Sequence, residues 1–474
     1  MTIAGIAAVV IAVILAAVLR FWASLGDFWM DEVLSWVLAT QQKSPLHVFT
    51  RVHHDNNHYV NTLILYAIGN DAPLYLYRLP AVIAGIGAVL LSGLVARSWG
   101  RVAAVTATLI TGCSFLLIQY SSEARGYAYL LFFTMASFAV LQKSLEHPRA
   151  VWDVLFACFA VLGFLSHLSF GFAYLALISW SLWRICFARD GRLPRRYVVP
   201  LIFQILVPAA VLVVVYLVDL RYLNREGGEV APVWSVISQA TSAAFGGPLE
   251  GPATVVVALA IMTMAAAALA LLFRQGIDSW VPLLMGIFVA PAIILLIFRP
   301  QWPYPRYFLI CALFLQLLIS WFLDWVYHRP HGKIAYLLII SAILCGNAFL
   351  TARLIQYGRG DYQGAVRYIV EHTRGQKIQV ASDNDFRNYL VFAFFFVRNG
   401  NSERLEYFNW GSWPAEGPEW VVIHNFAQRF APFDSFNDQQ GNTYSFAALF
   451  PYAGLSGFNW ALYHNRNRAA GDNR

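Results

Sequence analysis

Long runs of apolar residues recur along this 474-residue chain and limit what it can fold into. A helix of about 17–25 apolar residues crosses the ~30 Å hydrocarbon core of a bilayer. About eleven such runs are found by the length criterion. They lie near residues 3–25, 72–96, 102–119, 125–142, 151–166, 169–187, 198–218, 254–273, 279–298, 307–327 and 334–351. The pattern predicts an α-helical polytopic membrane protein.

The composition agrees with this class. Hydrophobic residues make up 59% of the chain and charged residues 12%, whereas about a quarter of a soluble domain is charged. These values exclude a disordered chain, a disulfide-stapled secreted fold and a cytosolic enzyme with a membrane anchor.

Lys and Arg predict the orientation, because positive residues near span ends stay on the cytoplasmic side. With a cytoplasmic N-terminus, the inner loops carry a clear excess of cations over acids, and the outer loops are nearly balanced. The net charge of +7 therefore reflects membrane topology, and no nucleic-acid partner is expected.

Two domains are predicted, a transmembrane domain over residues 1–351 and an extracytoplasmic domain over residues 352–474. An odd number of spans places the second domain outside. Its helix-like and strand-like runs predict a small α/β fold. These runs lie at residues 361–372, 377–382, 386–397, 404–409, 419–425, 444–450 and 459–464.

Two outer segments are too long for simple turns. The segment 26–71 is aromatic and apolar enough to form interfacial helices, and the segment 219–253 contains NREGGE and FGGPLEGP. Its glycines and prolines predict a mobile lid.

Asp31 and Glu32 follow the first span directly. Adjacent acids on a helix point about 100° apart, so one can face a cavity while the other orients a partner or a cation. Acids near a membrane are costly unless they are used or paired. The alternative is a helix-start pair favoured by the helix dipole.

The sequence HHDNNHY at residues 53–59 supplies a second candidate group. On a helix, His54 and His58 are four residues apart, as are Asp55 and Tyr59, so either pair can bind a metal ion or a phosphate. His167, in the short connection 166–169, is a further potential ligand. A polar loop at the lipid headgroups is the alternative.

Arginines near the outer span ends form a third group. Arg125 lies in SSEARGY, Arg306 precedes Tyr307 in YPRYF, and Arg78 lies in LYRLP. An arginine can hold a phosphate through two parallel hydrogen bonds. Interface ion pairs or snorkelling side chains are the alternatives. All of these candidates lie on the predicted outer side of the membrane, whereas unrelated positions would be scattered over both sides.

Six segments resemble, in this order, the GT-C class of membrane glycosyltransferases, near the bacterial protein O-mannosyltransferase and lipid A aminoarabinose transferase families. The segments are MDEVLSW, HHDNNHYVNTLILY, YRLPAVIAGIGAVL, SSEARGYAYLLFF, SHLSFGFAYL and YPRYFLI. The resemblance covers roughly residues 20–330. It implies a bacterial cytoplasmic-membrane enzyme that transfers a sugar from a polyprenyl-phosphate carrier, such as undecaprenyl phosphate, to a cell-envelope acceptor such as lipopolysaccharide.

The resemblance also implies residue roles. Asp31 matches the acid that acts as base, and Glu32 completes the DE pair of the mannosyltransferase branch. Arg125, Arg306 and Tyr307 match residues near the carrier phosphate. Where the aminoarabinose branch has Lys with paired prolines, this chain has Asn56-Asn57-His58, so that branch's metal and donor sugar do not carry over.

These roles give one mechanism. Asp31 deprotonates the acceptor hydroxyl, and a single displacement inverts the anomeric carbon. Arg125, Arg306 and His58, with Arg78 nearby, neutralise the departing phosphate. A divalent cation held by His54, Asp55, His58 and His167 is the alternative for that neutralisation.

The expected partners are the bilayer, the lipid-linked sugar donor and a lipid, glycan or protein acceptor. A transporter or lipid flippase is the alternative function. Transporters place ionisable residues near the bilayer midplane and show repeated halves. Here the spans hold few charges, which gather at one face.

Overall fold

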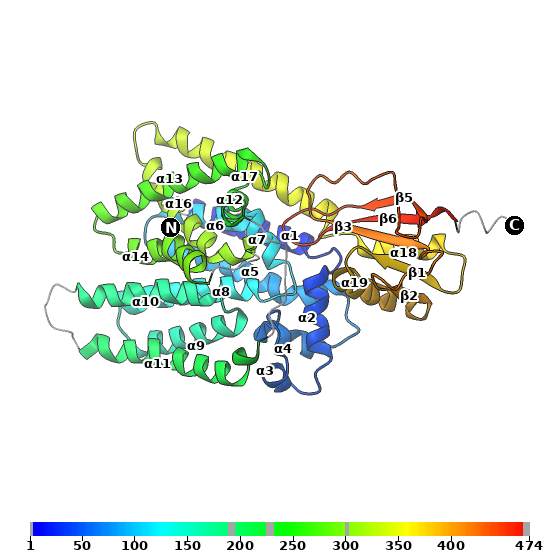
Figure 1. Ribbon diagram of the computed structural model, residues 1–474. Helices are drawn as coiled ribbons and strands as arrows, with labels where there is room; N and C mark the ends of the chain where they lie inside the picture. Colours follow the sequence, from blue (N-terminus) through cyan, green and yellow to red (C-terminus); the bar gives the residue numbers. More distant parts are fainter. Residues whose placement is uncertain (1–2, 188–194, 224–231, 299–302, 468–474) are drawn as a thin grey trace. The chain divides into compact units, whose positions relative to one another are not determined.

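The computed structural model describes residues 3–187, 195–223, 232–298 and 303–467 (Figure 1). The chain divides into two compact units. The first contains Met1–Ser24 and Leu38–Thr351, and the second contains Leu25–Val37 and Ala352–Arg474. The start of the long segment 26–71 therefore belongs to the unit that also holds the C-terminal domain.

The first unit is helical. Its helices are α1 (Ile3–Ala23), α3 (His47–Thr50), α4 (Tyr59–Ile68), α5 (Leu74–Ala96), α6 (Arg101–Cys113), α7 (Phe115–Ser121), α8 (Tyr127–Glu146), α9 (Ala150–Ser166), α10 (Phe170–Cys186), α11 (Arg195–Val218), η1 (Leu220–Tyr222), α12 (Val233–Ala244), α13 (Pro252–Arg274), α14 (Trp280–Leu284), η2 (Met285–Val289), α15 (Ala290–Ile293), η3 (Ile294–Phe298), η4 (Pro305–Phe308) and α16 (Leu309–Tyr327). Helices α2 (Met30–Thr40) and α17 (Gly332–Tyr357) run from one unit into the other.

The predicted membrane class is confirmed. Within the described ranges, 8 helices are long and apolar enough to cross a membrane, or 9 if the bent pair α6 and α7 is one span. Helices α9 and α10 have 17 residues each, the lower limit for crossing. Together these helices account for every predicted apolar run, so the chain is a multi-pass membrane protein.

Burial separates central from peripheral spans. In α8 and α16, 72% of the most apolar window is buried, against 17% in α1 and in the span Ile202–Tyr222. Peripheral spans can expose leucine and isoleucine because lipid tails are as apolar as these side chains. Helix α8 packs between α5 and α9 (Figure 1).

One span is broken where α6 and α7 meet at an angle of 59°. Ser114, between the two helices, is extended. The side-chain oxygen of Asn347 accepts a hydrogen bond from the Phe115 N–H at 2.7 Å, and Gln316 donates to the Ser114 hydroxyl at 2.9 Å. Backbone freed by a break at membrane depth needs such polar partners. The break directs α7 into the loop at residues 122–126.

The segment 219–253 is structured where it is described. NREGGE lies outside the described residues. FGGPLEGP is fixed in its middle, because the Ser242 hydroxyl donates to the Pro248 carbonyl at 2.8 Å and Gln239 donates to the Leu249 carbonyl at 3.0 Å. The lid role of this segment stays a prediction.

The second unit contains the predicted small α/β domain. Its elements are α18 (Tyr362–His372), β1 (Ile378–Ser382), α19 (Asp385–Arg398), η5 (Ser402–Arg404), β2 (Leu405–Phe408), β3 (Trp420–Asn425), β4 (Ser435–Asn437), β5 (Thr443–Phe450) and β6 (Asn459–Asn465). The strand order is β2-β1-β3-β6-β5-β4, with β2, β1 and β3 parallel and the remaining pairs antiparallel. The sequence did not predict β4, which has three residues.

Residues 25–37 are attached to this domain by specific contacts. The ring of Phe28 stacks on Phe394 with centroids 6.0 Å apart, and Trp36 meets the same ring edge-on at 5.2 Å. The Asp27 carboxylate accepts a hydrogen bond from the Gln363 N–H at 2.7 Å. These contacts fix the start of α2, which carries Asp31 and Glu32, in the second unit.

Candidate functional site

Three segments of the first unit bring aromatic and imidazole rings together. The ring centroids of His58 and His167 lie 4.8 Å apart, and Tyr127 lies 4.8 Å from His167 and 5.6 Å from His58. The three residues come from the segment before α4, the start of α8 and the connection between α9 and α10. We call this group, with Arg125 and Arg306, the histidine–arginine cluster.

A glycine permits this convergence. A Cβ atom at Gly126 would lie 2.1 Å from the Ser166 carbonyl oxygen and 2.8 Å from the Cβ of His58. Distances of this kind do not occur between real side chains and backbone, so the two segments could not approach as they do. The glycine in SSEARGY is thus a local sequence reason why the cluster forms.

Arg125 forms one wall of the cluster and is only 3% exposed. Its guanidinium donates a hydrogen bond to the side-chain oxygen of Asn56 at 2.5 Å and lies 4.9 Å from the centre of the Tyr127 ring. The Asn61 amide donates to the carbonyl of Ala124 at 2.8 Å and holds the loop against α4. The orientation of Arg125 is therefore fixed from two sides.

Arg306 contributes a second positive charge. It lies in η4, where its guanidinium is 4.1 Å from the centre of the Tyr304 ring. The ring of Tyr307 meets Tyr304 edge-on at 6.0 Å. Tyr307 also packs against a hydrophobic cluster that includes Phe308.

The two histidines respond to this environment. Burial lowers the pKa of His58 well below its usual range, and the nearby His167, Arg125 and Arg306 lower it further. Burial, followed by the charges of Arg125 and Arg306, lowers the pKa of His167 to about 3. Both imidazoles are thus neutral at pH 7, and the positive charge of the cluster comes from its arginines.

His58 offers an unused polar atom. Its side chain is 5% exposed, and its Nε2 is buried without a hydrogen-bond partner among the described residues. A cavity of about 80 Å³ is lined by His58, His167 and Asp55 among others, which is room for several water molecules or a small polar group. A buried imidazole nitrogen of this kind can bond to a water molecule or to an oxygen atom of a ligand in the cavity.

Asp219 supports the cluster and was missed by the sequence analysis. One carboxylate oxygen lies 2.5 Å from Nδ1 of His53, and the other accepts a hydrogen bond from the Tyr59 hydroxyl. Burial and this carboxylate raise the pKa of Tyr59. Asp219 ties the segment 53–59 to the end of α11. A lone acid at the end of a span was the available signal.

The expected helical spacing at residues 53–59 is wrong. Helix α4 begins only at Tyr59, and the preceding segment is irregular. Nδ1 of His54 accepts the N–H of Asn56 at 2.9 Å, and the Asn57 amide donates to two backbone carbonyls, at 2.8 and 2.9 Å. Local bonds of this kind compete with helix formation.

A divalent cation fits the cluster poorly. His54 is paired with Asp55 at 3.0 Å. His58 and His167 are adjacent, but two ligands alone do not form a metal site. Across the described part of the chain, no group of three or more His, Cys, Asp or Glu side chains is arranged to hold a metal ion. The neighbouring arginines repel a cation and attract an anion, so the donor set suits a phosphate better.

Arg78 contributes to the packing between two helices. It is fully buried in α5, and its guanidinium donates to the carbonyl oxygen of Ser24 at 3.0 Å. This hydrogen bond connects α5 with the end of α1.

The two predicted catalytic acids differ in their surroundings in the second unit. Glu32 is fully buried, and its carboxylate accepts a hydrogen bond at 3.4 Å from the N–H of Trp29, the residue before α2, as the glutamate of a capping box does. Asp31, one residue earlier in α2, is only partly buried. Glu32 thus fixes the start of the helix that carries Asp31.

The fold is that of the GT-C membrane glycosyltransferases. The oligosaccharyltransferase of Archaeoglobus fulgidus in the apo form superposes with a TM-score of 0.52 and 12% sequence identity over 85% of this chain. The chain spans 64% of the length of that protein. The same enzyme has also been solved in complex with Zn and sulfate.

ArnT of Cupriavidus metallidurans is a second similar protein. Its apo state gives a TM-score of 0.51 at 11% identity, covering 88% of this chain and 92% of ArnT. Its structure bound to undecaprenyl phosphate gives a TM-score of 0.50 at 13% identity, covering 87% and 92%. Neither a protein-family model nor a curated protein sequence matches the chain. The structural likeness therefore establishes the fold.

Proposed function

We propose that this protein is an inverting glycosyltransferase that uses a polyprenyl-phosphate-linked sugar. The acceptor is a lipid, a polysaccharide or a protein at the outer face of a bacterial cytoplasmic membrane. The observation that carries the proposal is the histidine–arginine cluster, which combines the buried Arg125, the partly exposed Arg306 and two neutral histidines in a GT-C fold. ArnT, a protein of similar fold, has been solved with undecaprenyl phosphate.

The cluster neutralises the leaving phosphate in this proposal. Arg125 is held by Asn56 and Tyr127 before any ligand arrives, so little reorganisation is needed when negative charge develops. Its burial strengthens the attraction, because the effective dielectric constant is lower than in water. Arg306 adds the second charge, and Nε2 of His58 supplies a hydrogen bond to a phosphate oxygen.

Asp31 acts as the general base, a role usually worth ~10²–10⁴-fold in rate. It removes the proton of the acceptor hydroxyl while that oxygen attacks the anomeric carbon. The bond from this carbon to the phosphate oxygen breaks, and the phosphate leaves with the electron pair. One such displacement inverts the anomeric centre. Glu32 positions the base by capping α2.

The experiment is mass spectrometry of the lipids that co-purify with Asp31→Asn, Arg125→Gln and wild-type protein in mild detergent. We expect a glycosylated polyprenyl phosphate to be enriched with Asp31→Asn, because the donor binds but is not consumed. Arg125→Gln is expected to lose it.

Lys143→Gln, at the other end of α8, is the matched control and should retain as much polyprenyl lipid as wild type. Absence of polyprenyl lipid from every preparation would overturn the proposed function. Full turnover by Asp31→Asn would overturn only the assignment of the base.

A further inference from the structure

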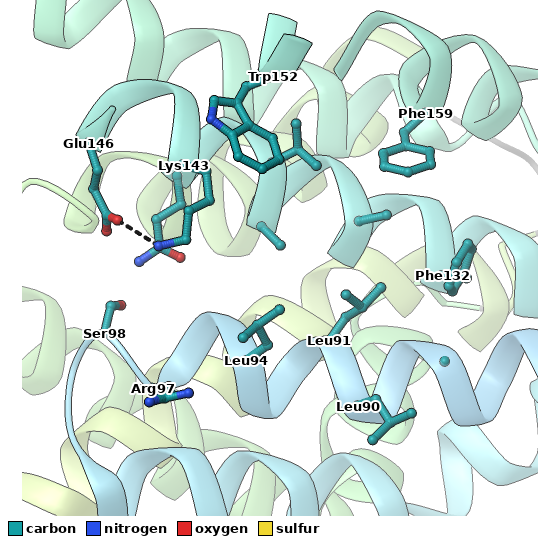
Figure 2. Close-up of a pocket in the computed structure, with 15 residues that line it drawn as sticks. Leu90, Leu91, Leu94, Arg97, Ser98, Phe132, Lys143, Glu146, Trp152 and Phe159 are labelled. Atoms are coloured by element: carbon teal, nitrogen blue, oxygen red, sulfur yellow. Dashed lines mark hydrogen bonds and ion pairs between the residues drawn. The ribbon is translucent and has the colours of Figure 1, made fainter. Parts of the chain in front are cut away.

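A large groove lies in the first unit between α5, α8 and α9, and the proposed reaction does not use it. Figure 2 shows its lining. The cavity volume is about 910 Å³, near the upper end of the ~300–1,000 Å³ that is usual for small-molecule sites. A volume of this size is enough for a flexible ligand of considerable length.

The walls of the groove are apolar. Leu90, Leu91 and Leu94 line it from α5, and Phe132 and Phe159 from α8 and α9. Leu90 and Leu94 are 49% and 51% exposed, so they meet the lipid on a span that crosses the membrane. The lining from Gly87 to Arg97 extends about 15 Å along α5. This shape fits a hydrocarbon chain.

The charged side chains gather at one end of the groove (Figure 2). Lys143 forms an ion pair with Glu146 at 3.1 Å, and both side chains are exposed. An ammonium group has three donors, so further bonds remain available. The Arg97 guanidinium has neither an ion pair nor a hydrogen bond among the described residues. Trp152, at the same end, is a residue type enriched at membrane interfaces.

This end is distinct from the histidine–arginine cluster. Tyr127 begins α8, and Lys143 lies in its last turn. At ~1.5 Å per residue, the two positions are about 24 Å apart along the helix, close to the thickness of a hydrocarbon core. A lipid whose phosphate lies beside Lys143 therefore belongs to the leaflet opposite the cluster.

We infer that this groove binds an anionic phospholipid of that opposite leaflet, which is the predicted inner leaflet. Its phosphate lies between Arg97 and Lys143, and one acyl chain follows the leucines of α5. Basic pockets between membrane helices recognise anionic headgroups in this way. The two cations outnumber the single acid at the end of the groove, which favours a lipid with net negative charge over a zwitterionic one.

Native mass spectrometry of the full-length protein in mild detergent tests this site, with phosphatidylglycerol and phosphatidylcholine as probes. Wild type is expected to bind phosphatidylglycerol in preference. Arg97→Gln combined with Lys143→Gln should weaken its binding at least about tenfold, because two cations that attract the anionic headgroup at the membrane surface are lost. Arg274→Gln combined with Lys333→Gln removes two other exposed cations and should change nothing.

A second variant tests the apolar part. Ala139→Phe fills the groove from the half-buried side of α8 and should reduce binding of both lipids, with thermal unfolding as the check on folding. Equal binding of the two lipids by wild type would overturn the inference, as would unchanged phosphatidylglycerol binding by the Arg97 and Lys143 double variant.

Displacement of phosphatidylglycerol by polyprenyl phosphate would also overturn the inference, because the groove would then hold the tail of the proposed donor. The site does not depend on the proposed reaction, since Asp31→Asn should bind phosphatidylglycerol as wild type does.

Discussion

The two ends of α8 carry similar residues in different surroundings. At the first end Arg125 is 3% exposed, bonded to Asn56 and placed over the ring of Tyr127. At the other end Lys143 is exposed and paired with an exposed Glu146. Solvent screens the ion pair of Lys143 and Glu146, whereas the buried charge of Arg125 acts strongly on its neighbours. Burial, rather than residue type, separates a potential catalytic cation from a lipid-headgroup contact.

Replacing the cation at each end tests this difference most directly. We expect Arg125→Gln to lower turnover by about 10²–10³-fold, the usual loss when one preorganised donor to a developing negative charge is removed. Lys143→Gln should change turnover by less than about twofold, since exposed ion pairs contribute little. The assay follows transfer from the co-purifying donor in reconstituted membranes.

Thermal unfolding of both variants separates lost chemistry from lost structure, because Arg125→Gln also removes a buried hydrogen bond. Equal turnover in the two folded variants would exclude Arg125 from the reaction and leave α8 without a functional difference between its ends.

The same contrast shows what sequence alone can predict. Apolar length predicts the spans, because the bilayer imposes a minimum helix length on any sequence. The break at Ser114 was not predictable, since the Asn347 amide that stabilises it is more than two hundred residues away. The attachment of residues 25–37 to the second unit likewise depends on a distant ring, that of Phe394.

The candidate site was predictable as a set of residues but not as an arrangement. His58, Arg125 and His167 stand out in the sequence because each lies on the predicted outer side, His58 in the long segment 26–71 and the other two at ends of apolar runs. Their convergence depends on the close approach at Gly126, which the sequence does not reveal. Asp219 was missed for the same reason, as its partners lie in a segment far away in the chain.

The stabilities of two glycine variants also compare the cluster with the groove. We expect Gly126→Ala to lower the free energy of unfolding by about 3 kcal/mol, because the new methyl group meets the Ser166 carbonyl, which cannot move easily. At the groove, a Cβ at Gly87 would lie 2.8 Å from the Phe132 ring, which can turn into empty space. The better helix propensity of alanine offsets part of that cost, so Gly87→Ala should be within about 1 kcal/mol of wild type.

Thermal unfolding in detergent measures both glycine variants. Gly126 has a φ of −68°, which alanine also adopts, so backbone strain does not explain an effect there. A loss of stability in Gly87→Ala as large as in Gly126→Ala would mean that the groove is as tightly packed as the cluster.

Acid gives a smaller expected effect than Gly126→Ala, and its sign follows from the histidines. The folded state lowers the pKa of His167 from 6.5 to about 3, so between these values the unfolded chain binds more protons. Stability should therefore fall as the pH is lowered from 7 to 5, by about 1–2 kcal/mol for this partly buried residue. His167→Gln should reduce that dependence, measured as the change in melting temperature between the two pH values. His147→Gln, exposed at the other end of α8, is the matched control and should keep it. An unchanged dependence in His167→Gln would mean that the imidazole of His167 is protonated in the folded protein at pH 5. Folding would then not lower its pKa.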